Sequence, residues 1–178
     1  CRRGTAPALA IAALKFKFQN IDPILLILPS DHQIKNKAEF LKSINFAKKS
    51  AESGSIVTFG IIPESPETGF GYIKAKSSLN NNEIVAHKIE EFIEKPNREI
   101  AEKLVQDKRF SWNSGIFMFK ASIFLKELEK FHPSIIINCK KALLNKTNDL
   151  DFQRLDDDFF KKCETISVDK AVMENTKI

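Results

Sequence analysis

The chain has 178 residues, of which 43% are hydrophobic and 29% are charged. This balance excludes an intrinsically disordered protein and suffices for one domain with a packed core. The formal net charge of +5 suits an anionic ligand such as a nucleotide or a sugar phosphate. No nucleic-acid partner is expected, because the lysines are spread along the chain without a basic stripe or interleaved aromatic residues.

The first helices and strands are predicted to alternate. Thr5 is expected to be the N-cap of the first helix, which is rich in alanine. Ile24–Leu28 is an uninterrupted apolar run and Ile56–Ile62 is a mostly apolar one; such runs are typical of strands buried on both faces of a parallel sheet. Between them, the sequence predicts a helix over Ala38–Ser53. This alternation predicts an α/β fold with a mainly parallel central sheet.

The middle of the chain has a different character. Two alternating segments, Tyr72–Lys76 and Ile84–Ile93, predict a small antiparallel insertion whose tip carries Asn80, Asn81 and Asn82. The remaining chain predicts a helix capped by Asn97 and running to about Gln106 and a strand at Ile116–Phe119. From Ala121 onward the pattern predicts helix, with Pro133 separating two helices. We expect all these elements to form a single domain over residues 1–178.

The cysteines and the N-terminal segment bear on location. Cys1, Cys139 and Cys163 are widely spaced and form neither the paired framework of a secreted protein nor a zinc-binding pattern. We therefore predict a cytoplasmic protein. Arg2 and Arg3 precede an apolar run that resembles a signal peptide, but lysines follow directly and no cleavage site is present. No run approaches the ~18 apolar residues of a membrane-spanning helix, so no membrane partner is expected.

Asp31 lies in a Pro-Ser-Asp-His segment directly after the first apolar strand. Ligands of open parallel sheets bind just beyond the carboxyl ends of the strands, so this position favours a role in binding. A carboxylate there suits Mg²⁺, which combines one or two carboxylates with phosphate oxygens. The alternative is a simple turn in which Asp31 caps the next helix.

Glu94 and Lys95 belong to a Glu-Lys-Pro segment at the end of a predicted strand. In a binding site, Glu94 would accept hydrogen bonds from sugar hydroxyls and Lys95 would neutralise a phosphate. The structural alternative is an exposed charge pair that leads into a proline turn.

Two glycine-containing segments are also open to two interpretations. Residues 112–115, Trp-Asn-Ser-Gly, form a turn or place the Asn113 amide beside a ligand. Residues 68–72, Thr-Gly-Phe-Gly-Tyr, either give a flexible entry to a strand or turn main-chain N–H groups toward a polar substrate. Neither segment has the spacing of a dinucleotide fingerprint or a Walker loop.

Considered together, seven segments resemble the bacterial mannose-1-phosphate guanylyltransferases, a branch of the sugar nucleotidyltransferases. They are residues 3–8, 28–32, 58–61, 67–73, 92–96, 112–117 and 167–174. The resemblance implies a Rossmann-like nucleotide-diphospho-sugar transferase core and the transfer of GMP from GTP to mannose 1-phosphate, giving GDP-mannose and pyrophosphate. The sugar phosphate would attack in line, without a covalent intermediate.

The resemblance also implies roles for individual residues. Asp31 would hold Mg²⁺ against the nucleotide phosphates, and Lys95 would bind the sugar phosphate. Asp169 would contact the sugar site or cap the last helix. Glu94 and Asn113 would bind mannose hydroxyls with help from the main chain at Gly71, and Thr5 and its neighbours would lie beside the guanine. The implied catalytic residues are Asp31 and Lys95, and the implied substrate-binding residues are Arg3, Thr5, Gly71, Tyr72, Glu94, Asn113 and Asp169.

The sequence departs from the family pattern in three ways. No glycine-rich phosphate loop precedes Cys1, the family's second metal-binding aspartate does not occur before Ile178, and Gly4 replaces the usual Asn or Asp. We therefore expect an internal fragment, truncated at both ends, that is weakly active or inactive alone. The alternatives are a nucleotidyltransferase for another sugar 1-phosphate, or a non-catalytic remnant or subunit completed by a second polypeptide. A homo-oligomer is a further hypothesis.

Overall fold

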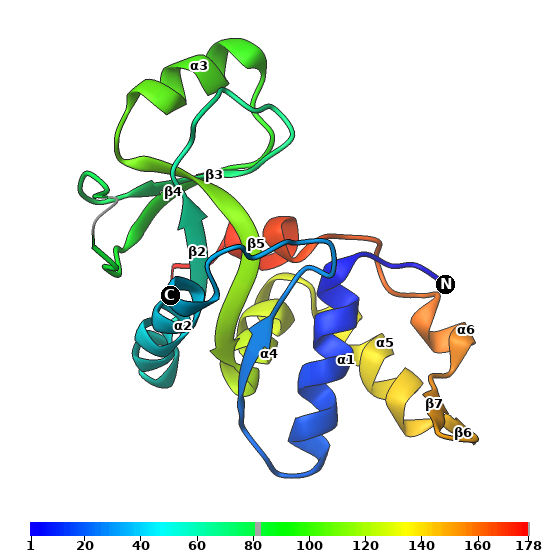
Figure 1. Ribbon diagram of the computed structural model, residues 1–178. Coiled ribbons are helices and arrows are strands. Elements are labelled where there is room, and N and C mark those ends of the chain that lie inside the picture. The colour runs from blue at the N-terminus through cyan, green and yellow to red at the C-terminus, as the bar shows by residue number, and fades with distance from the viewer. Residues whose placement is uncertain (81–82, 178) are drawn as a thin grey trace. The chain divides into compact units, whose positions relative to one another are not determined.

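The computed structural model describes residues 1–80 and 83–177 (Figure 1). The chain divides into two compact units. We call Ile24–Phe119 the sheet unit, and Cys1–Pro23 together with Lys120–Ile178 the helical unit. Asn81 and Asn82, predicted at the tip of the insertion, lie outside the described residues. The single domain over residues 1–178 stays a prediction.

The helices are α1 (Thr5–Phe18), α2 (Lys37–Glu52), α3 (Arg98–Gln106), α4 (Ala121–Phe131), α5 (Pro133–Leu144), α6 (Asp157–Phe160) and the short π-helical turn η1 (Asp169–Met173). The strands are β1 (Ile24–Ile27), β2 (Val57–Ile61), β3 (Tyr72–Ala75), β4 (Ile89–Ile93), β5 (Phe110–Lys120), β6 (Thr147–Asp149) and β7 (Phe152–Arg154). Among the described residues, no helix is long and apolar enough to cross a membrane.

Strand β5 organises the sheet of the sheet unit. The strand order is β1-β5-β3-β4, and β2 also pairs with β5. β2 and β3 run antiparallel to β5, and β4 runs antiparallel to β3. The predicted antiparallel insertion is confirmed, whereas the prediction of a mainly parallel central sheet is wrong for these pairs. Apolar runs could not decide the direction, because they report how deeply a strand is buried and not which way its neighbour runs.

Two helices cover the sheet. Ala47 and Ala51 of α2 pack on Met118 of β5 together with the apolar side chains of β1 and β2. Ala101 and Leu104 of α3 pack on β3 and β5 (Figure 1). Both helices begin at an asparagine whose side chain accepts a backbone N–H, from Glu39 in α2 and from Ile100 in α3. The predicted positions of these two helices are therefore confirmed.

The helical unit is built around α1, which packs against α4 and α5 (Figure 1). The buried face of α1 carries small residues, including the fully buried Ala6, Ala10 and Ala13. Because these side chains are short, the neighbouring helices approach closely and bury large side chains such as Phe124 and Ile135. The core of this unit thus follows from the alanine-rich sequence of α1.

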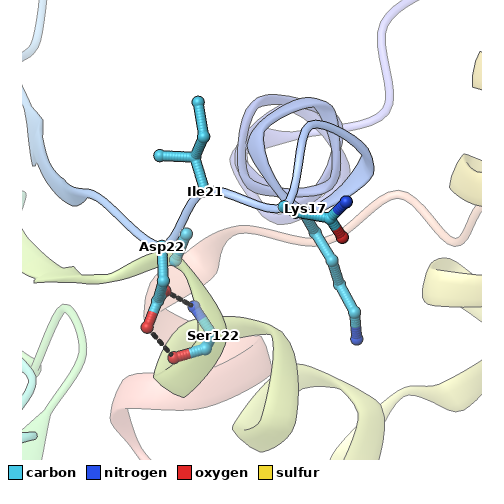
Figure 2. A pocket seen from close by; sticks show the side chains of 6 residues that line it. Lys17, Ile21, Asp22 and Ser122 are labelled. Atoms are coloured by element: carbon cyan, nitrogen blue, oxygen red, sulfur yellow. Dashed lines mark hydrogen bonds between the residues drawn. The ribbon is translucent and has the colours of Figure 1, made fainter.

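Asp22 caps helix α4 from outside the helix. Figure 2 shows its carboxylate turned toward Ser122, where it accepts hydrogen bonds from the backbone nitrogen at 2.8 Å and from the hydroxyl at 2.7 Å. Ala121 N–H donates to the Pro23 carbonyl at 3.0 Å. These contacts satisfy helix donors that would otherwise have no partner. We therefore interpret the hollow that Asp22 and Ser122 line as structural.

Three local predictions are wrong. Gly4, not Thr5, is the N-cap of α1, and the Thr5 hydroxyl instead accepts a hydrogen bond from Val168 N–H at 2.8 Å. Residues 112–115 lie inside β5 instead of before it. The β6–β7 hairpin lies where the sequence predicts helix. In each case a partner far along the chain, or a turn of only two residues, determines the local conformation.

Gly4→Ala tests the requirement for glycine at the start of α1. Gly4 has φ 77° and ψ −177°, and an added Cβ would overlap the Ile166 carbonyl group. Because the backbone at Gly4 or at Ile166 must move to relieve this overlap, we expect the free energy of unfolding to fall by at least about 2 kcal/mol, as measured by urea denaturation. Gly69→Ala, whose added Cβ meets nothing within 4 Å, is the control. Equal stability of the two variants would contradict this prediction.

The ion pair between Asp107 and Arg109 should make the stability of the fold depend on pH in the acid range. Arg109 donates to the carboxylate through its side chain, at 2.7 Å from Nη2 to Oδ2, and through its backbone N–H, which lowers the pKa of Asp107 from 3.8 to about 2. A lowered folded-state pKa stabilises the fold above pH ~4, and this contribution disappears as the pH falls toward 2. In Asp107→Asn, the urea midpoint of unfolding should therefore fall less between pH ~4 and pH ~2 than it does in the wild type. An unchanged acid profile would contradict the assignment.

Candidate functional site

The predicted site residues fall into two groups, one in each unit. Asp31, Gly71, Tyr72, Glu94, Lys95 and Asn113 belong to the sheet unit, and Arg3, Thr5 and Asp169 belong to the helical unit. We describe the two groups separately.

Gly71 brings Glu94 and Asn113 together at the end of β3. Asn113 N–H donates to the Gly71 carbonyl at 2.7 Å. On the other side, a Cβ added to Gly71 would lie 2.7 Å from Glu94 Oε2. Glycine is therefore the residue that lets the carboxylate approach the main chain so closely. Gly71 thus contacts Asn113 through its carbonyl and Glu94 at its Cα, and the binding of sugar hydroxyls by these residues stays a prediction.

Lys95 adds a cation to this cluster. Its Nζ lies 3.3 Å from Glu94 Oε1, and it has φ 46°, in the left-handed region. Neighbouring side chains on a strand point to opposite faces, but Lys95 has left the strand conformation after β4, so the two side chains meet. Such backbone conformations are uncommon for residues other than glycine and concentrate at functional sites. The Lys95 side chain is 63% exposed and that of Glu94 is 17% exposed, so the cation is accessible to an anion.

A wide irregularity in β5 shapes the Asn113 side of the cluster. Thr58 and Gly60 of β2 pair with Phe117 and Asn113, so Phe59 alone lies opposite residues 114–116 of β5. Gly115 has φ 70° within this segment. Bulges of this kind bend a strand and redirect its side chains, and they are frequent beside active sites.

The bulge is held by side chains of its own. Asn113 Oδ1 accepts from Gly115 N–H at 3.2 Å, and Ser114 Oγ accepts from Ile116 N–H at 3.2 Å. Thr58 Oγ1 lies 2.8 Å from Asn113 Oδ1 and 3.0 Å from the Ile116 carbonyl oxygen. These contacts replace the regular ladder bonds that the bulge removes.

Asp31 lies in the loop after β1, and its side chain is exposed. Two residues earlier, Pro29 Cγ lies 3.6 Å from the position of a Cβ on Gly115. The loop that carries Asp31 therefore passes against the bulge of β5. No described residue forms a hydrogen bond or ion pair with the Asp31 side chain, which leaves it available to a ligand.

Tyr72 has a structural place. Its side chain is fully buried in the cluster with Ala101, Leu104 and Phe110, and its hydroxyl donates to the Glu67 carbonyl at 2.9 Å. A substrate contact through this side chain would require it to leave the core. We therefore assign to Tyr72 the role of holding the loop that precedes Gly71, and its direct contact with substrate stays an untested prediction.

Arg3, Thr5 and Asp169 come together in the helical unit. The chain around Arg3 pairs with the segment before η1, through Ile166 N–H to the Arg3 carbonyl at 3.3 Å and Ala6 N–H to the Ile166 carbonyl at 3.2 Å. Thr5 accepts from Val168 N–H, which places it beside the first residue of η1, Asp169. The Ser167 hydroxyl accepts from Lys170 N–H of this turn at 3.4 Å.

Arg3 carries an unsatisfied donor. Its Nη1 donates to Thr165 Oγ1 at 3.2 Å, whereas Nε is buried and has no partner among the described residues. Buried donors are nearly always paired in folded proteins. A ligand contact near Arg3 stays a prediction.

The described residues contain no group of three His, Cys, Asp or Glu side chains that could hold a metal ion by themselves. An accessible carboxylate suits Mg²⁺, which keeps waters and substrate phosphates as its other ligands. The side chain of Asp31 is exposed, and its role as the magnesium ligand stays a prediction.

Sequence reasoning missed Thr58 as a site residue. It occurs in one of the seven segments that carry the resemblance, but no role was assigned to it. Its signal is that a hydroxyl interrupts the apolar run Ile56–Ile62. The ring of Trp112 packs edge-on against Phe70, the residue before Gly71, with centroids 5.2 Å apart.

The helices and strands described above define an α/β protein. The nucleotidyl transferase family model matches residues 1–159, which is most of the chain. The chain therefore belongs to the nucleotidyl transferase family.

Relatives and solved structures agree with this membership. The chain is 44% identical over 177 residues to mannose-1-phosphate guanylyltransferase of Escherichia coli strain K12, covering 98% of this chain and 37% of that protein. It is 46% identical over 177 residues to the Salmonella montevideo protein of the same name, with the same coverage. The chain thus spans about 37% of the length of these relatives.

A crystal structure from Helicobacter pylori, described as mannose-6-phosphate isomerase, superposes with a TM-score of 0.85 at 33% identity. The match covers 99% of this chain and 66% of that one. The Rossmann-like α/β class predicted from the sequence is confirmed, although the sheet pairs described above are antiparallel.

Gly71→Ala tests the close approach of Glu94 to the main chain. The added Cβ meets the far end of a flexible side chain, so we expect the fold to persist while the carboxylate shifts. Binding of mannose 1-phosphate, the sugar phosphate that the motifs imply, should weaken by about tenfold in titration calorimetry, the equivalent of one lost charged hydrogen bond.

Gly69→Ala, two residues earlier with open space around its added Cβ, is the matched control and should bind like the wild type. Equal affinity of the two variants would show that the Gly71–Glu94 contact does not matter for the ligand.

Proposed function

We propose that this chain carries the binding core of a mannose-1-phosphate guanylyltransferase, which transfers GMP from GTP to mannose 1-phosphate and releases pyrophosphate. Family membership supports a nucleotidyl transfer, and the names of the relatives support this pair of substrates. The observation that carries the proposal is the cluster of Glu94, Lys95, Asn113 and the Gly71 main chain at one end of the sheet.

The chemistry of the cluster matches a sugar phosphate. Glu94 offers carboxylate oxygens to hydroxyl donors, and the Asn113 amide offers N–H donors to hydroxyl oxygens. Lys95 offers a compact positive charge to the phosphate. Since Lys95 lies 3.3 Å from Glu94, one ligand that carries hydroxyls and a phosphate close together can satisfy both residues.

The reaction needs positioning and charge neutralisation more than covalent chemistry. An oxygen of the sugar phosphate must approach the α-phosphorus of the nucleotide in line with the leaving pyrophosphate. Lys95 would orient the attacking phosphate, while Glu94 and Asn113 fix the sugar ring. No described side chain has to form a bond with the substrate for this transfer to occur.

We assign Asp31 to a magnesium ion and the helical group to the nucleotide. Mg²⁺ bound at Asp31 would supply charge neutralisation at the nucleotide phosphates. Arg3 and Thr5 would lie beside the guanine, supported by the buried, unpartnered Nε of Arg3. Asp169, the first residue of η1, would contact the sugar.

Location and assembly complete the proposal. Cys139 and Cys163 are free, buried thiols whose sulfurs lie 3.7 Å apart, which supports a reducing, cytoplasmic environment. A homo-oligomer or a completing polypeptide stays a hypothesis that light scattering of the purified chain tests.

Titration calorimetry with GTP, with mannose 1-phosphate, and with each in the presence and absence of Mg²⁺ tests the proposed function. We expect saturable binding of GTP that strengthens at least tenfold with Mg²⁺, because Asp31 would hold the ion and the ion would supply charge neutralisation to the phosphates. Asp31→Ala should remove the Mg²⁺-dependent part and leave the sugar phosphate affinity unchanged.

Asp151→Ala, which removes an exposed carboxylate in the turn between β6 and β7, is the matched control and should behave as the wild type. A folded chain that binds neither substrate would exclude the proposed function. Tighter binding of ATP, UTP or dTTP than of GTP would favour the alternative of another nucleotide.

A further inference from the structure

Thr58 is the residue of β2 with a hydroxyl in an otherwise apolar strand, and its side chain reaches the bulge of β5. Its Oγ1 lies 2.8 Å from Asn113 Oδ1 and 3.0 Å from the Ile116 carbonyl oxygen. The site residues assigned above do not include it. Its contacts nevertheless end on the amide that is proposed to bind the sugar.

The orientation of the Asn113 amide follows from its donors. Gly115 N–H lies 3.2 Å from Oδ1, and a backbone N–H only donates, so the amide atom that faces it must be the oxygen. Thr58 then faces the same oxygen from β2. Its single hydroxyl proton lies between two acceptors, Asn113 Oδ1 and the carbonyl of Ile116, and the shorter distance is to Oδ1.

We propose that Thr58 is a positioning residue for sugar recognition. Its hydroxyl holds the Oδ1 end of the Asn113 amide against β2, so that the Nδ2 end is the one that donates toward the ligand. The inference rests on the proposed function for the identity of the ligand, and on the contacts of Thr58 and Gly115 for the orientation of the amide.

This orientation matters because the two ends of an amide have opposite hydrogen-bonding character. Nδ2 donates and Oδ1 accepts. Glu94, on the other side of Gly71, supplies only acceptors when ionised. A fixed Nδ2 donor therefore complements Glu94, so that one hydroxyl of the sugar donates to the carboxylate and another accepts from the amide. A reversed amide would place a second acceptor there and lose this complementarity.

Thr58→Val is the test variant, and Thr58→Ser is its matched control. Valine keeps the branched shape and removes the hydroxyl, whereas serine keeps the hydroxyl and removes the methyl group. The first measurement is the NMR signal of the Asn113 side-chain amide without ligand, assigned by its loss in Asn113→Asp. We expect the wild type and Thr58→Ser to share one ordered, slowly exchanging signal pair. In Thr58→Val this pair should shift and exchange faster with solvent.

The second measurement is the affinity for mannose 1-phosphate. We expect Thr58→Val to bind about 3- to 10-fold more weakly, which corresponds to one neutral hydrogen bond, and Thr58→Ser to bind within twofold of the wild type. The affinity for GTP should be the same in all three proteins. Urea unfolding of each variant shows whether a change in stability accompanies the change in affinity.

The outcomes separate this inference from the proposed function. If the wild type and Thr58→Val bind mannose 1-phosphate with equal affinity, or if the Asn113 amide signal is unchanged in Thr58→Val, the role of Thr58 is overturned. The proposed function would then remain in place. Equal losses of affinity and stability in both variants would also overturn it, because the hydroxyl would then be irrelevant. Failure of the wild type to bind mannose 1-phosphate would overturn the proposed function itself.

Discussion

The hydrogen bond from Asn113 N–H to the Gly71 carbonyl, at 2.7 Å, joins β5 to the entry of β3, and the candidate sugar site depends on it. It continues the antiparallel pairing of Tyr72 with Trp112 by one residue. Because Gly71 has no side chain, the Glu94 carboxylate approaches the same peptide from the neighbouring strand. Three separate segments of the chain therefore meet at one residue, and polar groups of different character lie within reach of one ligand.

This arrangement requires an irregular strand, and irregular backbone is costly unless its polar groups are paired. In β5 the pairing comes from nearby side chains. Asn113 and Ser114 each accept the N–H group two residues later, and Thr58 supports the bulge from β2. The same side chain, Asn113, thus stabilises the bulge and is the one proposed to bind the sugar. A residue with both tasks is constrained in its orientation, which favours a well-defined contact over an adaptable one.

The net charge of +5 does not by itself make a phosphate site, because some of the basic residues are already paired with acidic neighbours. Many lysines and arginines form exposed ion pairs with a neighbour on the same helix, such as Lys103 with Glu99 and Arg98 with Glu102. Pairs of this kind contribute little to stability and are screened by salt. Lys95 differs because the left-handed backbone holds it beside Glu94 at the end of a strand. Placement of one cation, not the overall charge, is what suits a phosphate.

The sequence by itself determined the α/β class, the positions of α2 and α3, the antiparallel insertion and the motif residues, because each depends on local periodicity, capping or turn chemistry. It also indicated the family, since the motifs occur in a specific order. Only the tertiary structure decided the direction of the sheet pairs, the length of β5 with its bulge, and the contacts of Thr58 and Tyr72. These features depend on partners distant in the chain, such as Gly71 with Asn113 or Thr5 with Val168. No local pattern encodes such partners, because hydrogen-bonding groups of the backbone are the same in every residue except proline and only the fold selects which of them meet.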